Sequence, residues 1–313
     1  MDLKKQLEIL LPTYNRKKHL ERTLQQILAE DLPLKQVSIT VLDNGSTDGT
    51  SELLSRYTAQ YPNLKHIRHP KNIGGNANIT RAFEMAKAEY VWVLADDDEY
   101  DFSHAEELAQ ALEKKPDALL VVSDKRQTLG VGDLFQEMSF VPAAIYRSEI
   151  ITADTLTYMY FNIRCMLPHL AVAAALFNAG KTVQILPHPL VIPKPRPDYS
   201  RGLESWQPPI FQQMDWILGY FCSVQLLKDT SMQKQCLLAL NMDGDNFYNR
   251  CGRFMALPKN KILLYGLGIS FHPGWLKLWF ALLAWPAYAC SFYRTERGLY
   301  IRLFGRFKTK IWK

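Results

Sequence analysis

Three consecutive aspartates, Asp96 to Asp98, directly follow the apolar run from Tyr90 to Ala95. Carboxylates this close together at the end of a buried strand repel one another, so some would stay protonated unless a cation were bound nearby. Magnesium in proteins is typically held by one or two carboxylates together with substrate phosphates and water. The segment therefore predicts a divalent metal site. The alternative is a solvated loop that opens the next helix.

Three other polar segments follow apolar runs in the first part of the chain. They read LPTYNR (residues 11–16), LDNGSTDGT (42–50) and NIGGNANITRA (72–82). Their glycines would let a ligand approach the backbone. Asp43 could accept a hydrogen bond from a nucleobase or a ribose. In the alternative interpretation, residues 42–50 form an ordinary strand-to-helix loop that is capped by Asp48 or Thr50.

The elements that position these segments follow from hydrophobic periodicity. Short apolar runs at residues 7–11, 37–42, 64–67, 90–95 and 118–123 predict buried strands, and apolar residues with helical spacing lie between them. This alternation predicts an α/β fold, a Rossmann-like, mostly parallel sheet flanked by helices on both faces. In such sheets ligands bind outside the carboxyl ends of the strands. The four polar segments should therefore meet at one edge.

A proline-rich segment, with seven prolines from Pro187 to Pro209, follows the strand-and-helix pattern. It predicts the end of the α/β body or a loop beside the site. We expect residues 1–200 to form the catalytic domain and residues 201–313 to form a helical C-terminal region. Three residues of the segment could close over a ligand as a lid, although a solvated linker is the alternative: Arg196, Arg201 and Trp206.

In order and spacing, the four polar segments resemble those of the inverting family 2 glycosyltransferases, which have the nucleotide-sugar-binding GT-A fold. The resemblance covers roughly residues 5–125 and continues more weakly to about residue 190. Within the family, the chain is most similar to abequosyltransferase-like enzymes of bacterial surface-polysaccharide synthesis. The chain contains no QxxRW sequence, which argues against a processive polysaccharide synthase.

The resemblance implies a role for particular residues. Asp96 and Asp98 would bind Mg²⁺ or Mn²⁺ on the donor diphosphate, and Asp97 is kept as a reserve ligand and as a catalytic candidate. The donor-binding set has members in all four segments: Pro12, Thr13, Tyr14, Arg16, Asp43, Asn72, Gly74, Gly75, Asn78 and Asp96.

The chain also departs from the family pattern. Many relatives have an Arg-Asn pair where this chain has Ala77 and Asn78, so no base-contacting arginine is assigned there, and Arg81 is the substitute considered. Ala95 stands where many relatives have a first aspartate. A second Asp-x-Asp at residues 243–245 lacks companion segments, and a loop that ends a helix is the better interpretation.

Inverting transfer also needs a base that takes the proton of the acceptor hydroxyl. In the family this base usually comes from an acidic pair that opens a helix, with a glycine eleven residues after the second acid. Here Pro168 and His169 take the place of that pair, and Gly180 follows at the expected distance. His169 is either the base or a metal ligand, or a structural residue at a helix start. In the latter case the base comes from elsewhere, such as Asp154 or Asp124.

The last residues of the chain differ from the rest in charge. Residues 294–313 contain four Arg and three Lys against Glu296 alone, which accounts for the whole net charge of +6. The rest of the chain is neutral overall, so its charge does not indicate a nucleic-acid-binding domain. Residues 278–293 carry no charge but are shorter than the roughly 20 residues that span a bilayer. This pattern predicts a tail that lies on an anionic membrane surface. A hydrophobic helix packed on the catalytic domain is the alternative.

These observations lead to one prediction and two rivals. We expect a metal-dependent glycosyltransferase that moves a single sugar from a nucleotide-sugar donor to a lipid-linked glycan at the membrane. A nucleotidyltransferase is less consistent with the sequence, because LPTYNRKKHL lacks the expected glycines, and a non-catalytic binding module is the other rival. The five cysteines show no CxxC spacing, and the apolar run before Pro12 is too short for a signal peptide. We therefore expect a cytoplasmic protein on the inner face of the membrane.

Overall fold

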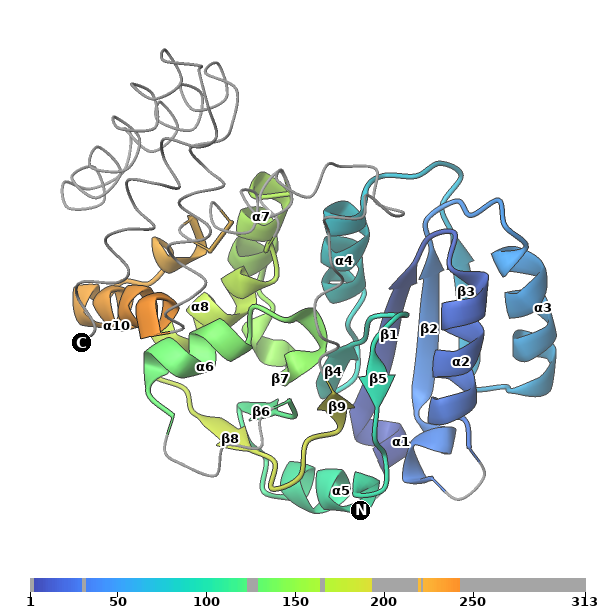
Figure 1. Ribbon diagram of the computed structural model, residues 1–313, viewed down its shortest axis with the longest axis horizontal. Helices are drawn as coiled ribbons and strands as arrows, with labels where there is room; N and C mark the ends of the chain where they lie inside the picture. Colours follow the sequence, from blue (N-terminus) through green and yellow to red (C-terminus); the bar gives the residue numbers. More distant parts are fainter. Residues whose placement is uncertain are drawn as a thin grey trace, which may run out of the picture. The chain divides into compact units, whose positions relative to one another are not determined.

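A mixed sheet of seven strands, in the order β3-β2-β1-β4-β7-β6-β8, lies at the centre of the fold (Figure 1). Within it β7 runs antiparallel to β4 and β6, and the other neighbouring strands are parallel. A second, small sheet pairs β5 with β9. The strand bounds are Leu7–Thr13 (β1), Ser38–Asp43 (β2), Leu64–Arg68 (β3), Tyr90–Val93 (β4), Glu99–Tyr100 (β5), Ala118–Leu120 (β6), Ala144–Arg147 (β7), Val183–Ile185 (β8) and Val191–Ile192 (β9).

The computed structural model describes residues 3–29, 32–122, 129–163, 167–192, 219–220 and 222–242. All of them belong to one compact unit that ends at Met242. The domain boundary predicted near residue 200, the three lid candidates, the second Asp-x-Asp and the basic tail lie outside the described residues. None of the helices in the described part combines the length and the apolar character that a bilayer-spanning segment needs.

Helices connect most of the strands. Their bounds are Leu3–Gln6 (α1), Lys17–Ile27 (α2), Thr50–Gln60 (α3), Gly75–Glu84 (α4), Ala105–Glu113 (α5), Val131–Glu137 (α6), Ala153–Phe161 (α7), Leu170–Asn178 (α8) and Thr230–Met242 (α10), with short 3₁₀ turns at Pro33–Gln36, Val141–Ala143 and Ser148–Ile150. The five strands expected from the apolar runs are all present, with ends that differ by a few residues. The antiparallel β7 and the β5–β9 pair were not expected.

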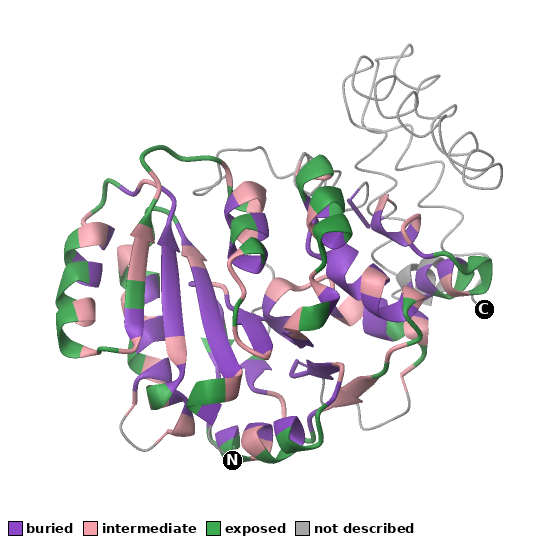
Figure 2. Ribbon diagram, turned by 180° about the vertical axis from the view of Figure 1, so that it is seen from behind, coloured by how far each residue is buried: buried purple, intermediate pink, exposed green. Residues whose placement is uncertain are grey.

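Each face of the large sheet has its own hydrophobic core. In β1, Leu7, Ile9 and Leu11 enter the core that α2, α3 and α5 cover, whereas Leu10 enters the core on the side of α4, α6 and α8. This alternation follows from the two-residue period of a strand. Figure 2 shows the result, with buried strands and with helices that expose one side to solvent. The prediction of a mostly parallel sheet with helices on both faces is confirmed.

Helix α10 belongs to the region that the sequence assigned to the C-terminal part, and it packs closely against α6. Gly132 of α6 allows this approach, because a Cβ at that position would lie only 2.3 Å from the carbonyl oxygen of Gln235. Cys236 of α10 is buried in the core that also contains α8. The α/β body is therefore continuous with at least this helix of the C-terminal part.

Candidate active site

The register of the parallel strands aligns the polar segments at one edge of the sheet. Thr13 pairs with Asp43, and Asp43 pairs with Arg68 on the next strand. On the other side of β1, Leu10 pairs with Val93, which lies three residues before Asp96. Because Thr13 also lies three residues after Leu10, its hydroxyl reaches the Asp96 carboxylate and donates a hydrogen bond to Oδ2 at 2.6 Å. The predicted gathering of these segments at one edge is therefore present.

Arg16 is the cation that faces the aspartates. Its Nη1 lies 3.2 Å from Asp96 Oδ1, and the same guanidinium forms an ion pair with Asp97. The Asp96 side chain is almost fully buried, whereas Arg16 and Asp97 are each nearly half exposed. One buried carboxylate thus has a hydroxyl donor on one oxygen and a guanidinium on the other.

Burial dominates the electrostatics of Asp96. It raises the pKa of Asp96 to about 6, against the opposing effects of the Arg16 charge and the Thr13 hydrogen bond. Burial alone would lower the pKa of Arg16, but the Asp96 and Asp97 carboxylates outweigh it and raise that pKa. Asp96 is therefore a carboxylate whose negative charge is not fully compensated by its neighbours.

Helix α2 fixes the backbone of the aspartate segment. Arg22 Nη2 donates to the carbonyl oxygens of Asp97 and Asp98 at 3.3 and 3.2 Å, and Thr23 Oγ1 donates to the carbonyl oxygen of Asp96 at 3.1 Å. Asp98 itself is buried. The sequence analysis missed Arg22 and Thr23. The available signal was weak, namely a threonine between Leu20 and Leu24 on the buried face of an amphipathic helix.

Asp43 is enclosed by its own strand-to-helix loop. Its side chain is fully buried; Oδ1 accepts a hydrogen bond from the backbone of Ser46 at 2.8 Å, and Oδ2 accepts one from Ser51 Oγ at 3.0 Å. Arg68 Nε lies 3.7 Å from the same Oδ2. Gly49, and not Asp48 or Thr50, is the N-cap of α3, and Asp48, one residue earlier, accepts hydrogen bonds from the backbone and the hydroxyl of Thr50 with its Oδ1. Asp43 therefore orders this loop.

The segment around Asn72 forms the entry to α4. Asn72 Oδ1 accepts hydrogen bonds from Asn44 Nδ2 and from the backbone of Gly74, both at 2.8 Å. Gly74 has a φ of 92° with a ψ of 150°, a conformation that is essentially restricted to glycine. A Cβ added at Gly74 or at Gly75 would meet no atom of the described residues within 4 Å. The backbone here is therefore open to a ligand.

Not all predicted donor residues face this open space. Asn78 is buried, where its Nδ2 donates to the carbonyl oxygen of Leu42 at 2.9 Å and its Oδ1 lies 3.0 Å from His69 Nε2. Arg81 forms a surface ion pair with Glu84 at 2.8 Å. Pro12 lies within β1, and Tyr14, just after that strand, is exposed. Asn78 thus makes hydrogen bonds inside the protein, and Arg81 pairs with a neighbour at the surface of α4.

His169 immediately precedes α8 and has only 1% of its surface exposed. Its Nε2 lies 3.1 Å from the carbonyl oxygen of Ser139. Burial lowers the pKa of His169 to about 4, although hydrogen bonding to the backbone of Ser139 and Met138 opposes this shift. Of the two roles left open by the sequence, this environment favours the structural one. Asp154 is exposed on α7, and Asp124 lies outside the described residues.

Similarity to known proteins agrees with this arrangement. Residues 8–172, more than half of the chain, match the family model described as glycosyl transferase family 2. An uncharacterized glycosyltransferase of Mycoplasma pneumoniae is 29% identical over 106 residues, which are 34% of this chain and 35% of that protein. Abequosyltransferase RfbV of Salmonella typhimurium is 32% identical over 94 residues, 29% of this chain and 28% of that protein. The chain thus spans about a third of the length of these relatives.

The fold is also similar to that of a solved structure. The crystal structure of residues 1–349 of S. aureus TarS aligns with a TM-score of 0.58 and 15% sequence identity, and the alignment covers 90% of this chain and 89% of that one. At this identity the likeness establishes the fold alone, which is the GT-A fold. Taken with the family match, it leads to one conclusion: the chain belongs to glycosyl transferase family 2.

Proposed function

We propose that this protein is a glycosyltransferase that transfers a single sugar, with inversion and with the help of a divalent metal ion, from a nucleotide-sugar donor to a lipid-linked oligosaccharide in bacterial surface-polysaccharide synthesis. The observation that carries the proposal is the buried Asp96 carboxylate, which Thr13 and Arg16 hold at the carboxyl edge of the parallel strands. This is the edge at which ligands bind in open α/β sheets.

The residues present fit a hard divalent cation. Asp96 and Asp98 provide buried carboxylate oxygens, which are the donors that Mg²⁺ and Mn²⁺ prefer. The raised pKa of Asp96 supports this assignment, because a nearby cation stabilises the charged form of a buried carboxylate. When bound there, such an ion would neutralise negative charge on the departing diphosphate. Asp96 and Asp98 are the residues we assign to hold it, with Asp97 in reserve.

We assign donor binding to the surface next to these carboxylates. The open backbone at Gly74 and Gly75, where α4 begins, suits a phosphate or a ribose, because the N-terminal end of a helix favours negative charge. Tyr14 and Ile73 leave apolar side chains exposed at the strand ends, where a nucleobase could stack on them. S. aureus TarS has been crystallised with UDP-GlcNAc, which supports a nucleotide-sugar donor here.

For the catalytic base we favour Asp97 over His169. The Asp97 side chain is 42% exposed and lies beside Arg16, whereas the imidazole of His169 is enclosed. A general base must reach the acceptor hydroxyl directly or through one water molecule. The exposed side chain of Asp97 at the edge of the sheet would let it meet this requirement, and in this role it would accept the acceptor proton as the new bond forms.

The acceptor class rests on the relatives and on the tail. One relative, abequosyltransferase RfbV, has the name of an enzyme of surface-polysaccharide synthesis. The basic, aromatic residues 294–313 would hold the enzyme on the inner leaflet, where lipid-linked glycans are accessible. Deletion of the chain from Gly274 onward should release the protein from anionic liposomes in a flotation assay. Continued binding of the truncated protein would remove the membrane part of the proposal.

A donor panel tests the chemistry directly. Purified protein would be incubated with UDP-, GDP-, dTDP- and CDP-sugars in the presence of Mg²⁺, Mn²⁺ or a chelator, and release of the nucleoside diphosphate would be measured. We expect one donor class to turn over, with loss of turnover in chelator and in the Asp96→Asn variant. Asp101→Asn serves as the matched control, because Asp101 is exposed and its Oδ1 accepts a hydrogen bond from the backbone of Ser103, a contact that asparagine can keep. Turnover that survives chelation, or release of pyrophosphate in place of a nucleoside diphosphate, would contradict the proposal.

A further inference from the structure

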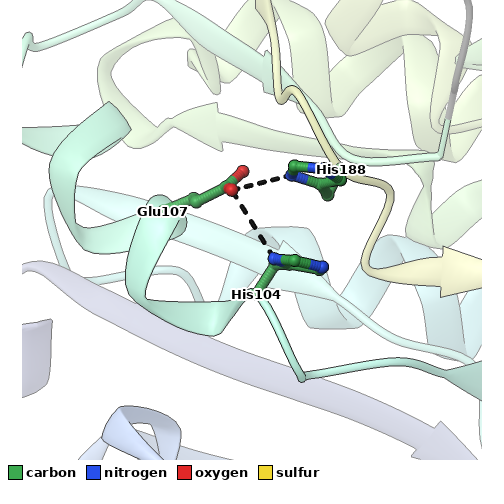
Figure 3. A group of neighbouring side chains, drawn as sticks. All are labelled: His104, Glu107 and His188. Atoms are coloured by element: carbon green, nitrogen blue, oxygen red, sulfur yellow. Dashed lines mark hydrogen bonds and ion pairs between the residues drawn. The ribbon is translucent and has the colours of Figure 1, made fainter.

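A second group of metal-binding side chains lies outside the aspartate segment. His104 directly precedes α5, Glu107 lies in the first turn of that helix, and His188 comes from the connection between β8 and β9 (Figure 3). The two histidines point toward the same carboxylate. His188 Nδ1 lies 2.7 Å and His104 Nδ1 lies 3.6 Å from Glu107 Oε1.

The spacing of these atoms is close to that of ligands around one ion. One ligand atom from each of the three residues lies within 4.8 Å of those from the other two. Around a zinc ion with bonds of about 2.0–2.1 Å, neighbouring tetrahedral ligands are about 3.3 Å apart. Shifts of well under about 1 Å would bring the two Nδ1–Oε1 separations to this value. The ligand nitrogens of the two imidazoles, which lie within 4.8 Å of each other, would have to approach as well. The imidazole rings are stacked, with centroids 3.9 Å apart and an interplanar angle of 13°, so at least one ring must turn before both nitrogen lone pairs point at one ion.

The surroundings of the group favour a cation. Glu107 Oε2 is buried and has no hydrogen-bond partner among the described residues. Glu106 adjoins Glu107 in the first turn of α5, and together the two acids offset the positive end of the helix dipole. Asp101 interacts electrostatically with His104, which lowers the pKa of Asp101 in addition to the larger effect of its hydrogen bonds from Ser103. The Glu107 carboxylate therefore interacts with both imidazoles, and Asp101 interacts with that of His104.

We propose that His104, Glu107 and His188 bind a zinc ion. Two imidazole nitrogens and one carboxylate oxygen form a ligand set that suits zinc, whereas Mg²⁺ and Ca²⁺ prefer oxygen ligands throughout. The side chains of His104 and His188 are 46% and 39% exposed, which leaves room for water as a fourth ligand. No cysteine contributes, so this site differs from the cysteine-based zinc sites that a sequence pattern can reveal.

Zinc at this position would join two segments that are distant in sequence. It would tie the start of α5 to the β8–β9 connection, close to the place where β5 pairs with β9. The residues of β5 lie between Asp98 and His104, so the ion would also stabilise the segment that follows the three aspartates in the sequence. Its role is structural, and the proposal does not depend on the proposed transferase function.

Zinc binding by the full-length chain tests this proposal. Chelator-treated protein would be titrated with ZnCl₂ by calorimetry, in excess MgCl₂ to occupy oxygen-ligand sites. We expect one equivalent of zinc to bind, and each of His104→Ala, Glu107→Gln and His188→Ala to weaken binding by about tenfold or more, because loss even of outer-shell partners costs 10- to 100-fold. His19→Ala and Glu52→Gln are matched controls on exposed residues of α2 and α3 and should bind as the wild type does.

Two further measurements separate zinc binding from misfolding. Far-ultraviolet circular dichroism in chelator should show the same fold in all variants, and zinc at a hundredfold its Kd should increase the folding equilibrium constant of the wild type about a hundredfold. The His104→Ala variant keeps the 2.7 Å contact between His188 and Glu107, although it removes the 3.6 Å pair and the stacking of the two imidazoles. Absence of saturable binding in the wild type, or equal binding in the three folded variants, would overturn the proposal.

Discussion

Arg16 and Asp96 form an ion pair at the carboxyl edge of β1 and β4, with 3.2 Å between Nη1 and Oδ1. Thr13 holds the other oxygen of Asp96. The guanidinium thus provides, within the protein itself, part of the positive charge that the buried carboxylate requires. A divalent ion on Asp96 would approach the same negative charge, so we expect Arg16 and the metal ion to compete for it.

The competition predicts that Arg16→Gln increases affinity for Mn²⁺ in the absence of donor. A partly exposed ion pair contributes up to about 1 kcal/mol, so affinity should rise by about fivefold. Isothermal titration calorimetry with MnCl₂ measures the change. Arg56→Gln is the control, because Arg56 is exposed and lies 3.8 Å from Glu21 on the surface. An unchanged or weaker Mn²⁺ affinity in Arg16→Gln would show that the guanidinium does not compete with the ion.

Asp96→Asn should abolish transfer without destabilising the metal-free protein above pH 6. The folded-state pKa of Asp96, about 6, lies above the ordinary value of 3.8. Between these values the folded state binds more protons than the unfolded state, so the wild type loses stability as pH rises through this range. Asparagine carries no charge and should remove this loss.

Thermal unfolding of the wild type and Asp96→Asn in chelator, from pH 4 to pH 8, measures the difference. The variant should gain stability relative to the wild type as pH increases to about 6 and then keep a constant difference. Transfer should fall by at least about a hundredfold, the scale at which lost electrostatic stabilisation affects catalysis. A constant stability difference across the whole pH range would indicate that Asp96 does not titrate as described.

The sequence predicted the edge of the sheet better than it predicted the contacts there. The carboxyl ends of parallel strands meet at one edge, so the proximity of Thr13, Asp43 and Asp96 follows from the order of elements alone. The hydrogen bonds from Arg22 and Thr23 do not follow in this way, because they depend on how α2 packs over the aspartate segment. Such contacts between elements leave no periodic signal in the sequence.

Asn78 and His169 are two predicted site residues whose side chains contact the protein interior, and in each case a sequence signal was available. Asn78 precedes Ala82 by one helical turn, and both lie on the buried side of α4. His169 precedes the segment Leu170–Phe177, which is apolar throughout, and a helix without a polar face is buried on all sides. Resemblance to a family assigned both residues by their place in a motif, whereas hydrophobic pattern would have predicted their burial.

Gly75→Ala should weaken donor binding and leave stability unchanged. Gly75 is the first residue of α4, and a methyl group there would meet no atom of the described part of the protein within 4 Å. The methyl group would therefore lower only the affinity for a donor that occupies the same space. We expect the donor Kd to rise about tenfold, equivalent to about 1.4 kcal/mol, as measured by calorimetry with the donor that turns over.

Gly180→Ala provides the control for Gly75→Ala, because it also adds a methyl group in open space but at the far end of α8. Gly180 has a φ of 66°, so this substitution should cost about 1–2 kcal/mol of stability and should leave donor affinity unchanged. Equal donor affinity in Gly75→Ala and the wild type would remove Gly75 from the donor site.

His169→Gln should reduce the pH dependence of stability. The pKa of His169 is lowered from 6.5 to about 4 in the folded state. Between these values the unfolded state binds more protons, so the wild type loses roughly 3 kcal/mol of stability as pH falls from 6.5 to 4. Glutamine does not titrate, and its amide can still donate to the Ser139 carbonyl. Urea unfolding at several pH values measures this difference, and comparison of the two proteins cancels the opposite contribution of Asp96.

The same variant decides between the two roles of His169. A general base contributes a factor of about 10² to 10⁴ to the rate, so loss of the base would lower kcat by that factor. We expect kcat at neutral pH to stay within a few-fold of the wild-type value, because the imidazole is buried and contacts the backbone of Ser139. Asp97→Asn should show the large loss instead. If kcat collapsed in His169→Gln while donor binding and folding were intact, the histidine would be the base and the proposal for Asp97 would fail.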